Sequence, residues 1–178
     1  MREKSSGHAG RAPPAFTLQP NLIMNSDIKS TIKTLNDLIE TLRDGQHGFK
    51  TAAEDVKASE LAQLFNRYSV QRGEFVAELQ ARVLALGADV EKSGSVSGSV
   101  HRGWINLKAA LSSNEPHAVL AECERGEDSA VAAYKEALDN QDLDLPTREL
   151  LNRQYHEVKG AHDKVKQLRD GVTYRKAS

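Results

Sequence analysis

The feature that most constrains this chain is a long helical seam near its N-terminus. From Ile28 to Val56, apolar residues recur in alternating steps of four and three. The seam is more than twice as long as the average globular helix of about 11–12 residues. Helices of this length are typical of bundles, in which each helix buries one apolar stripe. Its members are Ile28, Ile32, Leu35, Ile39, Leu42, Gln46, Phe49, Ala53 and Val56.

Gln46 is the one polar member of this seam. Gly45 and Gly48 flank it, and each glycine should cost a helix about 1 kcal/mol relative to alanine. We therefore expect the two glycines to permit close approach of a neighbouring helix.

Three further helices follow. The second is predicted over residues 59–86, with Ser59 as N-cap and Gly87 at its C-terminal end. The third ends near Asn140, and the fourth covers residues 146–171, beginning at a proline. Because the break before Ser59 is short, the first two helices should be antiparallel neighbours.

A long connection separates the second helix from the third. It opens with the glycine- and serine-rich stretch 93–99, which predicts a flexible segment. A short amphipathic helix follows, with Val100, Trp104, Leu107 and Leu111 on one face. A connection of this length can cross the whole bundle, so the third helix can start at the same end as the second. We expect Trp104 to seal this crossover helix against the bundle.

The charge balance and the single cysteine exclude several classes of protein. The chain has 25 acidic and 24 basic residues, so no bulk charge favours nucleic acid or anionic lipid. Cys123 cannot form an internal disulfide, and no apolar run approaches the roughly 18 residues of a membrane span. The N-terminus also lacks the apolar segment of a secretory signal. We therefore expect a cytoplasmic protein that binds neither nucleic acid nor membrane.

The ends of the chain show no apolar periodicity. Residues 1–24 are rich in glycine and proline and predict a disordered tail, and residues 172–178 should fray. The bundle is expected over residues 25–171. Two interpretations of the tail stay open: a flexible extension, or an over-extended start with Met24 as the true first residue.

Glu127 is the unusual residue of the third helix. At helical spacing it shares a face with apolar or small residues on either side. A carboxylate in such a seam must be paired, protonated or bound to a metal, because burying it alone is too costly. The face consists of Leu120, Cys123, Glu127, Ala130, Tyr134 and Ala137.

Equal helical rise from the turns places other polar residues at the level of Glu127. In the predicted layer, Glu127 pairs with Arg72 or with His162, and the two glutamine side chains complete a buried hydrogen-bonded network. Its members are Gln46, Gln71, Arg72, Glu127 and His162.

Short strings of residues carry a resemblance to a known family. Asp44-Gly45-Gln46 in the first helix echoes Arg125-Gly126-Glu127 in the third, which suggests two copies of one helical hairpin. Together with His101-Arg102-Gly103-Trp104 and the string 122–128, this resembles a bacterial four-helix-bundle family of unknown function within the ferritin-like group. The resemblance spans residues 25–170. It implies an all-α, ferritin-like four-helix bundle whose long crossover carries a short helix, and it implies no activity.

The sequence departs from the di-iron pattern of many ferritin-like proteins. That pattern takes a Glu from each of two helices and a Glu-x-x-His from each of the other two. Here the first helix offers Gln46, the second helix has no Glu-x-x-His, and Glu157 is followed three residues later by Gly160. A degenerate iron or manganese site built from Glu127, Glu124 and His162 remains the alternative to the structural network.

Two functional hypotheses follow. The first is a non-enzymatic structural or interaction role, through a homo-oligomer or a protein partner, with the polar network inside the core and no cofactor. The second is a metal-binding protein with a redox or stress-related role. The sequence offers no catalytic residues: Cys123 lies on the core face with no adjacent histidine, and neither a phosphate-binding loop nor a paired-cysteine zinc motif is present. Whether the protein is an enzyme stays open.

Overall fold

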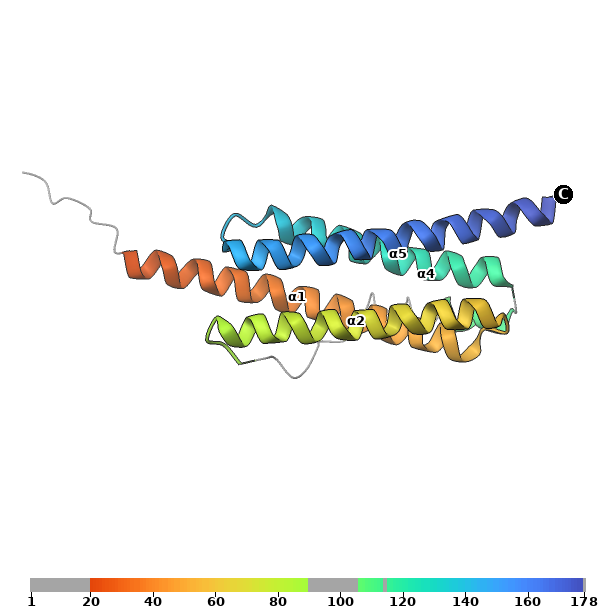
Figure 1. Ribbon diagram of the computed structural model, residues 1–178, viewed down its shortest axis with the longest axis horizontal. Coiled ribbons are helices and arrows are strands. Elements are labelled where there is room, and N and C mark those ends of the chain that lie inside the picture. Colours follow the sequence, from red (N-terminus) through yellow and green to blue (C-terminus); the bar gives the residue numbers. More distant parts are fainter. Residues whose placement is uncertain (1–19, 90–105, 114, 178) are drawn as a thin grey trace, which may run out of the picture.

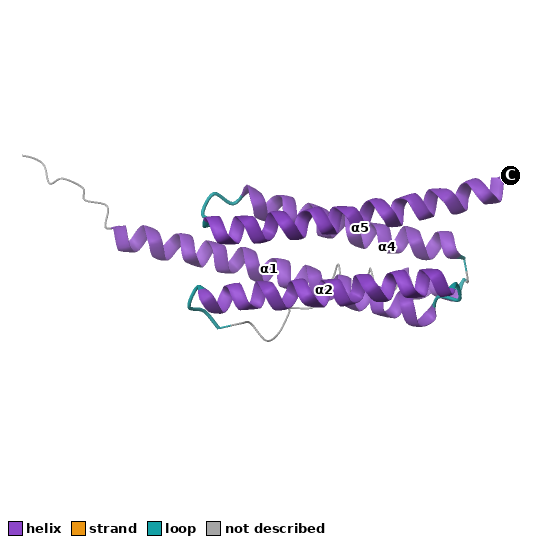
Figure 2. Cartoon of the chain, viewed as in Figure 1, coloured by secondary structure: helices purple, strands orange, loops and turns teal. Residues whose placement is uncertain are grey.

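The computed structural model describes residues 20–89, 106–113 and 115–177, with side chains placed from Ser26 to Gly171. Within these residues every regular element is a helix (Figure 2). The four long helices are α1 (Pro20–Asp55), α2 (Ser59–Ala85), α4 (Pro116–Asp139) and α5 (Leu145–Ala177). The all-α prediction is confirmed.

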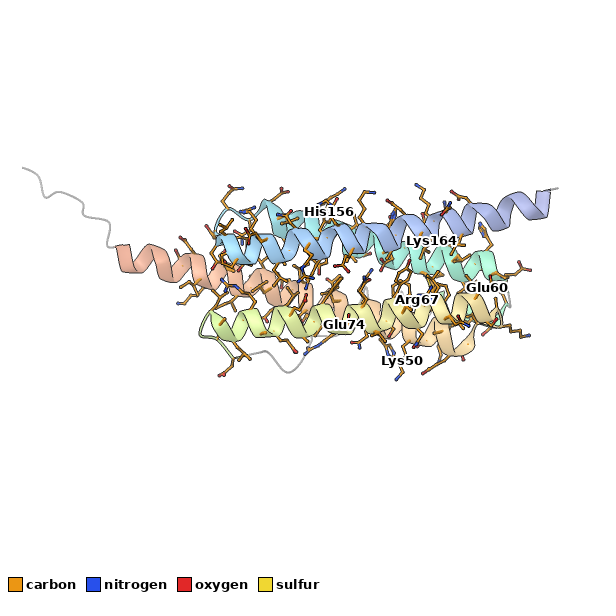
Figure 3. The ribbon with its side chains drawn as sticks, in the orientation of Figure 1. Lys50, Glu60, Arg67, Glu74, His156 and Lys164 are labelled. Carbon is orange, nitrogen blue, oxygen red and sulfur yellow. The ribbon has the colours of Figure 1, made fainter. Side chains whose placement is uncertain are left out.

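The long helices form an antiparallel bundle of two hairpins (Figure 1). In this bundle α1 packs against α2 and α4, and α5 packs against α4 and α2. Helices α2 and α4 start at the same end, as expected for a long crossover between the hairpins (Figure 1). Charged residues such as Lys50, Arg67 and Lys164 are exposed, and Figure 3 shows their places on α1, α2 and α5. No helix of the described segments is long and apolar enough to span a membrane.

The helix boundaries differ from the sequence expectation at both ends. Helix α1 begins at Pro20, so the last residues of the expected tail are helical, whereas residues 1–19 lie outside the described part. Proline suits the first helical position, because its missing N–H would be unpaired there in any case. Helix α5 continues through Gly171 to Ala177, where we expected fraying. A single glycine weakens a helix but does not end it when no proline follows.

The caps of α2 are partly as expected. Ala58, and not Ser59, is the N-cap, and it makes no side-chain cap bond. At the other end Gly87 adopts a left-handed φ of 84°. Its N–H bonds Leu84 O at 3.0 Å, and the N–H of Ala88 bonds Val83 O at 3.3 Å. This is the paired hydrogen-bond pattern of a Schellman motif, which requires the left-handed conformation that glycine adopts without strain.

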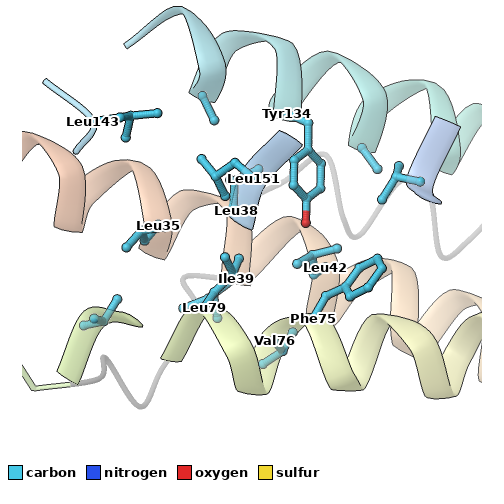
Figure 4. Packing of buried hydrophobic residues seen from close by; sticks show 14 residues of the cluster. Leu35, Leu38, Ile39, Leu42, Phe75, Val76, Leu79, Tyr134, Leu143 and Leu151 are labelled. Carbon is cyan, nitrogen blue, oxygen red and sulfur yellow. The ribbon is translucent and has the colours of Figure 1, made fainter. Parts of the chain in front are cut away.

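Two apolar clusters fill the bundle. The first contains Leu35, Leu42, Leu79, Tyr134 and Leu151 from all four long helices (Figure 4). The second contains Phe49, Phe65, Leu120, Cys123 and Val165, again from all four. Gln46 of α1, Arg72 of α2 and Glu127 of α4 lie between the two clusters along their helices and form a polar layer.

Part of the predicted crossover helix is described. Residues 106–112 are helical, and Leu107 and Leu111 are buried in the second cluster. The described part of the predicted amphipathic face therefore packs on the bundle. Val100, Trp104 and the stretch 93–99 lie outside the described residues.

Candidate functional site

Arg72 occupies the centre of the polar layer. Arg72 lies on the inward face of α2, together with Phe65 and Phe75, and its exposed fraction is 0%. The guanidinium carbon lies 5.8 Å from the ring centroids of both Phe49 and Phe75. Aromatic faces attract a guanidinium, and the attraction is strongest where water is excluded. Arg72 is therefore held between a ring of α1 and a ring of its own helix.

The partner of Arg72 across the bundle is Glu127 of α4. Arg72 Nη2 donates to Glu127 Oε2 at 2.5 Å, and both side chains are almost completely buried. Charge-assisted bonds of this kind are about twice as strong as neutral ones. Burying both charges is itself costly, so the pair is a strongly coupled unit whose members depend on each other.

A second bond links the buried pair to the surface. Arg72 Nη1 donates to Gln71 Oε1 at 2.6 Å, and Gln71 Nε2 donates to Glu157 Oε2 of α5 at 2.9 Å. Glu157 is exposed. The polar groups thus form a continuous path from the core, along α2, to the solvent-exposed face of α5.

Burial sets the electrostatics of this region. It raises the pKa of Glu127, while the charge and hydrogen bond of Arg72 act in the opposite direction. Burial also raises the pKa of Cys123, and the neighbouring Glu127 charge adds to that effect. The Cys123 thiol is therefore held protonated, and a protonated thiol is a poor nucleophile.

Gln46 does not bond the charged pair through its side chain. That side chain lies over Gly73, where an added Cβ would come within 2.7 Å of Gln46 Nε2. The backbone of Gln46 is tied to α2 as well, because Ser69 Oγ donates to its carbonyl oxygen at 3.0 Å. Close helix approach was expected at Gly45 and Gly48, but Gly45 makes only an ordinary contact with Arg72 and Gly48 has nothing within 4 Å. The glycine that meets the facing helix is Gly73.

The hydrogen-bond partners of His162 are two aspartates and not Glu127. Its Nε2 lies 2.9 Å from Asp128 Oδ1, and its Nδ1 lies 2.9 Å from Asp163 Oδ1. Of the two partners proposed for Glu127, the structure places Arg72 in contact. The charge of His162 opposes the rise in the pKa of Glu127 that burial causes.

The three candidate metal ligands are not brought together. Glu127 bonds Arg72, Glu124 is ion-paired with Arg169 of α5, and His162 contacts Asp128. In the described part of the chain, no group of three or more His, Cys, Asp or Glu side chains is placed to hold a metal ion. Each of the expected ligands Glu127, Glu124 and His162 therefore has a partner other than the remaining two.

Sequence reasoning missed a second buried polar contact, which lies beside the polar layer, among the residues of the first apolar cluster. Tyr134 Oη donates to Gln154 Oε1 at 2.7 Å, and both residues are fully buried. Gln154 Nε2 donates to Glu78 Oε2 at 2.6 Å, and Arg153 Nη2 bonds the same oxygen at 2.9 Å. The available signal was that Tyr134 shares a face with apolar residues of the third helix, and that Gln154 lies at helical spacing from Leu150, Leu151 and Val158 in the fourth. Two hydrogen-bonding groups at such positions need each other.

Comparison with known proteins fits this picture. Residues 30–140, more than half of the chain, match the model of a domain of unknown function, DUF2383. The chain belongs to this family. A solved structure of a Dps1 mutant from Mycobacterium smegmatis superposes on it with a TM-score of 0.65, at 12% sequence identity. The match covers 82% of this chain and 98% of that one, so the family member has a ferritin-like fold. No curated protein matches the sequence.

Proposed function

We propose that this ferritin-like protein has a non-enzymatic structural or interaction role, and that it acts by association with a second copy or with a protein partner. One observation carries the proposal: the inward-facing charges of the core are engaged with one another. The buried guanidinium of Arg72 bonds Glu127, and Glu124 is ion-paired with Arg169. Ion pairs inside the core stabilise one arrangement of the helices. Among the described residues, no group of three or more His, Cys, Asp or Glu side chains is placed to hold a metal ion.

The one thiol of the chain supports the same conclusion. Cys123 is buried in the second apolar cluster, and its environment disfavours the thiolate. Reactive cysteines instead lie in electropositive and partly exposed surroundings. Cys123 therefore serves as a small packing residue.

The outer surface offers apolar groups for association. Val70, Leu84 and Leu145 are large hydrophobic residues with more than half of their surface exposed, at 54%, 58% and 68%. The first turns of α1 also extend beyond the ends of the neighbouring helices (Figure 1). These features support contact with another protein.

The full-length protein, purified without a metal-affinity tag, tests both halves of the proposal. Light scattering across a range of concentrations should reveal a species larger than the monomer, and a V70K/L84K double variant should shift the population towards the monomer. A monomer at every concentration would exclude association between copies, and direct the search to a different protein partner.

Metal analysis of the same sample tests the alternative, a metal-binding protein with a redox or stress-related role. We expect no stoichiometric iron or manganese, either as purified or after incubation with iron(II) or manganese(II). Near-stoichiometric metal that is lost in Glu127→Gln would overturn the structural role and restore the metal-binding hypothesis.

A further inference from the structure

We propose that the Arg72 side chain is the resident cation of the bundle core, occupying from within the chain a site whose chemistry suits a planar organic cation. The inference goes beyond the proposed function, because it concerns what the core accepts and not what the surface contacts. Iron, the metal that a ferritin-like fold implies, does not fit the residues present.

The oxygen atoms that converge on the site are too few for a metal pair. Glu127 Oε2 and Gln71 Oε1 approach the guanidinium at 2.5 and 2.6 Å, from α4 and α2 respectively. One carboxylate and one neutral amide are a sparse set for metals that require several oxygen or nitrogen ligands each. The same two oxygens accept hydrogen bonds from the two terminal nitrogens, Nη1 and Nη2, of a planar guanidinium.

The remaining walls of the site are aromatic. Phe49 and Phe75 each place a ring centroid 5.8 Å from the guanidinium carbon. A phenyl ring cannot ligate a metal ion, but its face stabilises a delocalised and weakly hydrated cation. The walls therefore discriminate in favour of an organic cation over iron or manganese.

The guanidinium also takes the place of a metal in the architecture. It touches α1 through Phe49, belongs to α2, bonds α4 through Glu127, and reaches α5 through Gln71 and Glu157. In di-metal ferritin-like proteins, inward carboxylates and histidines of all four helices gather around the ions. Here a single side chain contributes the positive charge that connects the four helices.

Chemical rescue tests this assignment. Arg72→Ala removes the cation and leaves Glu127, Gln71 and the two rings in the full-length chain. Tens of millimolar guanidinium chloride, far below denaturing concentrations, should raise the thermal midpoint of Arg72→Ala by about 3–5 °C if the ion binds at around ten times its dissociation constant. Sodium chloride at equal concentration should not, and the parent should show no rise.

The matched control is the double variant Arg72→Ala/Glu127→Gln, which keeps the space but loses the carboxylate. Guanidinium should not raise its midpoint. An equal response of both variants, or no response of Arg72→Ala, would overturn the proposal. So would a larger rise of Arg72→Ala with manganese(II) than with guanidinium, since that would show a metal site behind the arginine.

A second variant covers the case in which Arg72→Ala does not fold. Arg72→Lys keeps the positive charge but has neither the planar fork nor the delocalised cation, and Arg72→Met keeps only the volume. The midpoints should follow the order parent, Arg72→Lys, Arg72→Met. Equal midpoints for the lysine and methionine variants would show that the charge at this position has no role, and would overturn the assignment.

Discussion

Arg72 and Glu127 meet at 2.5 Å in the middle of the bundle, with an apolar cluster on either side of them. Both side chains are buried. Hydrogen bonds from Arg72 to Gln71, and from Gln71 to Glu157, connect the guanidinium to the surface. The stability of the fold depends on both members of the pair, because removal of either one leaves a charge buried without its partner.

Replacing Arg72 by methionine should destabilise the fold strongly. Methionine has a long, flexible side chain but no charge, so it leaves the Glu127 carboxylate uncompensated. The free energy of unfolding should therefore fall by about 3–5 kcal/mol at neutral pH. Urea unfolding followed by circular dichroism measures the loss. A loss below about 1 kcal/mol would contradict the prediction, because it would show that the fold does not depend on Arg72 to compensate Glu127.

The loss in Arg72→Met should depend on pH. Burial raises the pKa of Glu127 above its ordinary 4.5, and Arg72, which opposes that rise, is gone in the variant. A carboxyl whose pKa is raised in the folded state contributes stability that is complete below its unfolded pKa and is lost as pH rises through its folded pKa. Arg72→Met should therefore be closest to the parent at about pH 4 and fall further behind as the pH increases. Arg72→Met/Glu127→Gln, which has no such carboxyl, should show no extra loss over that range.

Removing both charges together should restore much of the stability. In Arg72→Met/Glu127→Leu neither side chain carries a charge, and apolar replacements of buried ion pairs are often neutral or stabilising by about 1–4 kcal/mol. The two single variants and the double variant form a cycle that gives the coupling energy directly. If the two effects are simply additive, the residues do not interact and the pairing is refuted.

Gly73 and Gly48 should respond differently to alanine. A Cβ at Gly73 would lie 2.7 Å from Gln46 Nε2, so the end of the Gln46 side chain must move, and this cost should offset the gain in helix propensity and leave Gly73→Ala within about 0.5 kcal/mol of the parent. Gly48→Ala meets nothing within 4 Å and should stabilise by about 0.5–1 kcal/mol through helix propensity. Thermal melts of both variants test the contrast, and Gln46→Ala should relieve the strain of Gly73→Ala.

Tyr134→Phe should remove the donor of a buried hydrogen bond. Gln154 Oε1 accepts from Tyr134 Oη at 2.7 Å, and both side chains are fully buried. Leaving one buried acceptor unpaired should cost about 1–3 kcal/mol. Tyr155→Phe, in a partly buried position of α5, is the control and should change stability by less than about 0.5 kcal/mol. Equal effects would show that the Tyr134 hydroxyl does not matter.

Much of this fold was predictable from periodicity. The alternating seam of α1, the short turn before α2 and the proline at the start of α5 placed three helices, and the long connection determined where α4 begins. The family resemblance led to the ferritin-like fold, which the comparisons confirm. The start of α1 was missed because the composition of residues 1–24 predicted a disordered tail, whereas α1 begins at Pro20. The end of α5 was missed because Gly171 was interpreted as the limit of a helix that continues through it.

The site was predictable to the level of a layer but not of its contacts. Equal rise brought Arg72 and Glu127 to one height, yet the choice between Arg72 and His162 as partner depends on rotation about the helix axes. Each residue turns a helix by about 100°, so small differences in rotation decide whether His162 faces the core or, as observed, Asp128. Spacing along the sequence does not contain that angle, and the close contact at Gly73 depends on it as well.

The polar layer between the two apolar clusters also determines how the helices align along their lengths. Long seams of similar aliphatic residues can slide past one another by a helical turn, about 5.4 Å, at little loss of apolar contact. Such a slide between the two hairpins would carry Arg72 and Glu127 towards opposite apolar clusters and separate Gln154 of α5 from Glu78 of α2. The layer thus fixes the register of the two hairpins, because the observed alignment is far more stable than one shifted by a helical turn.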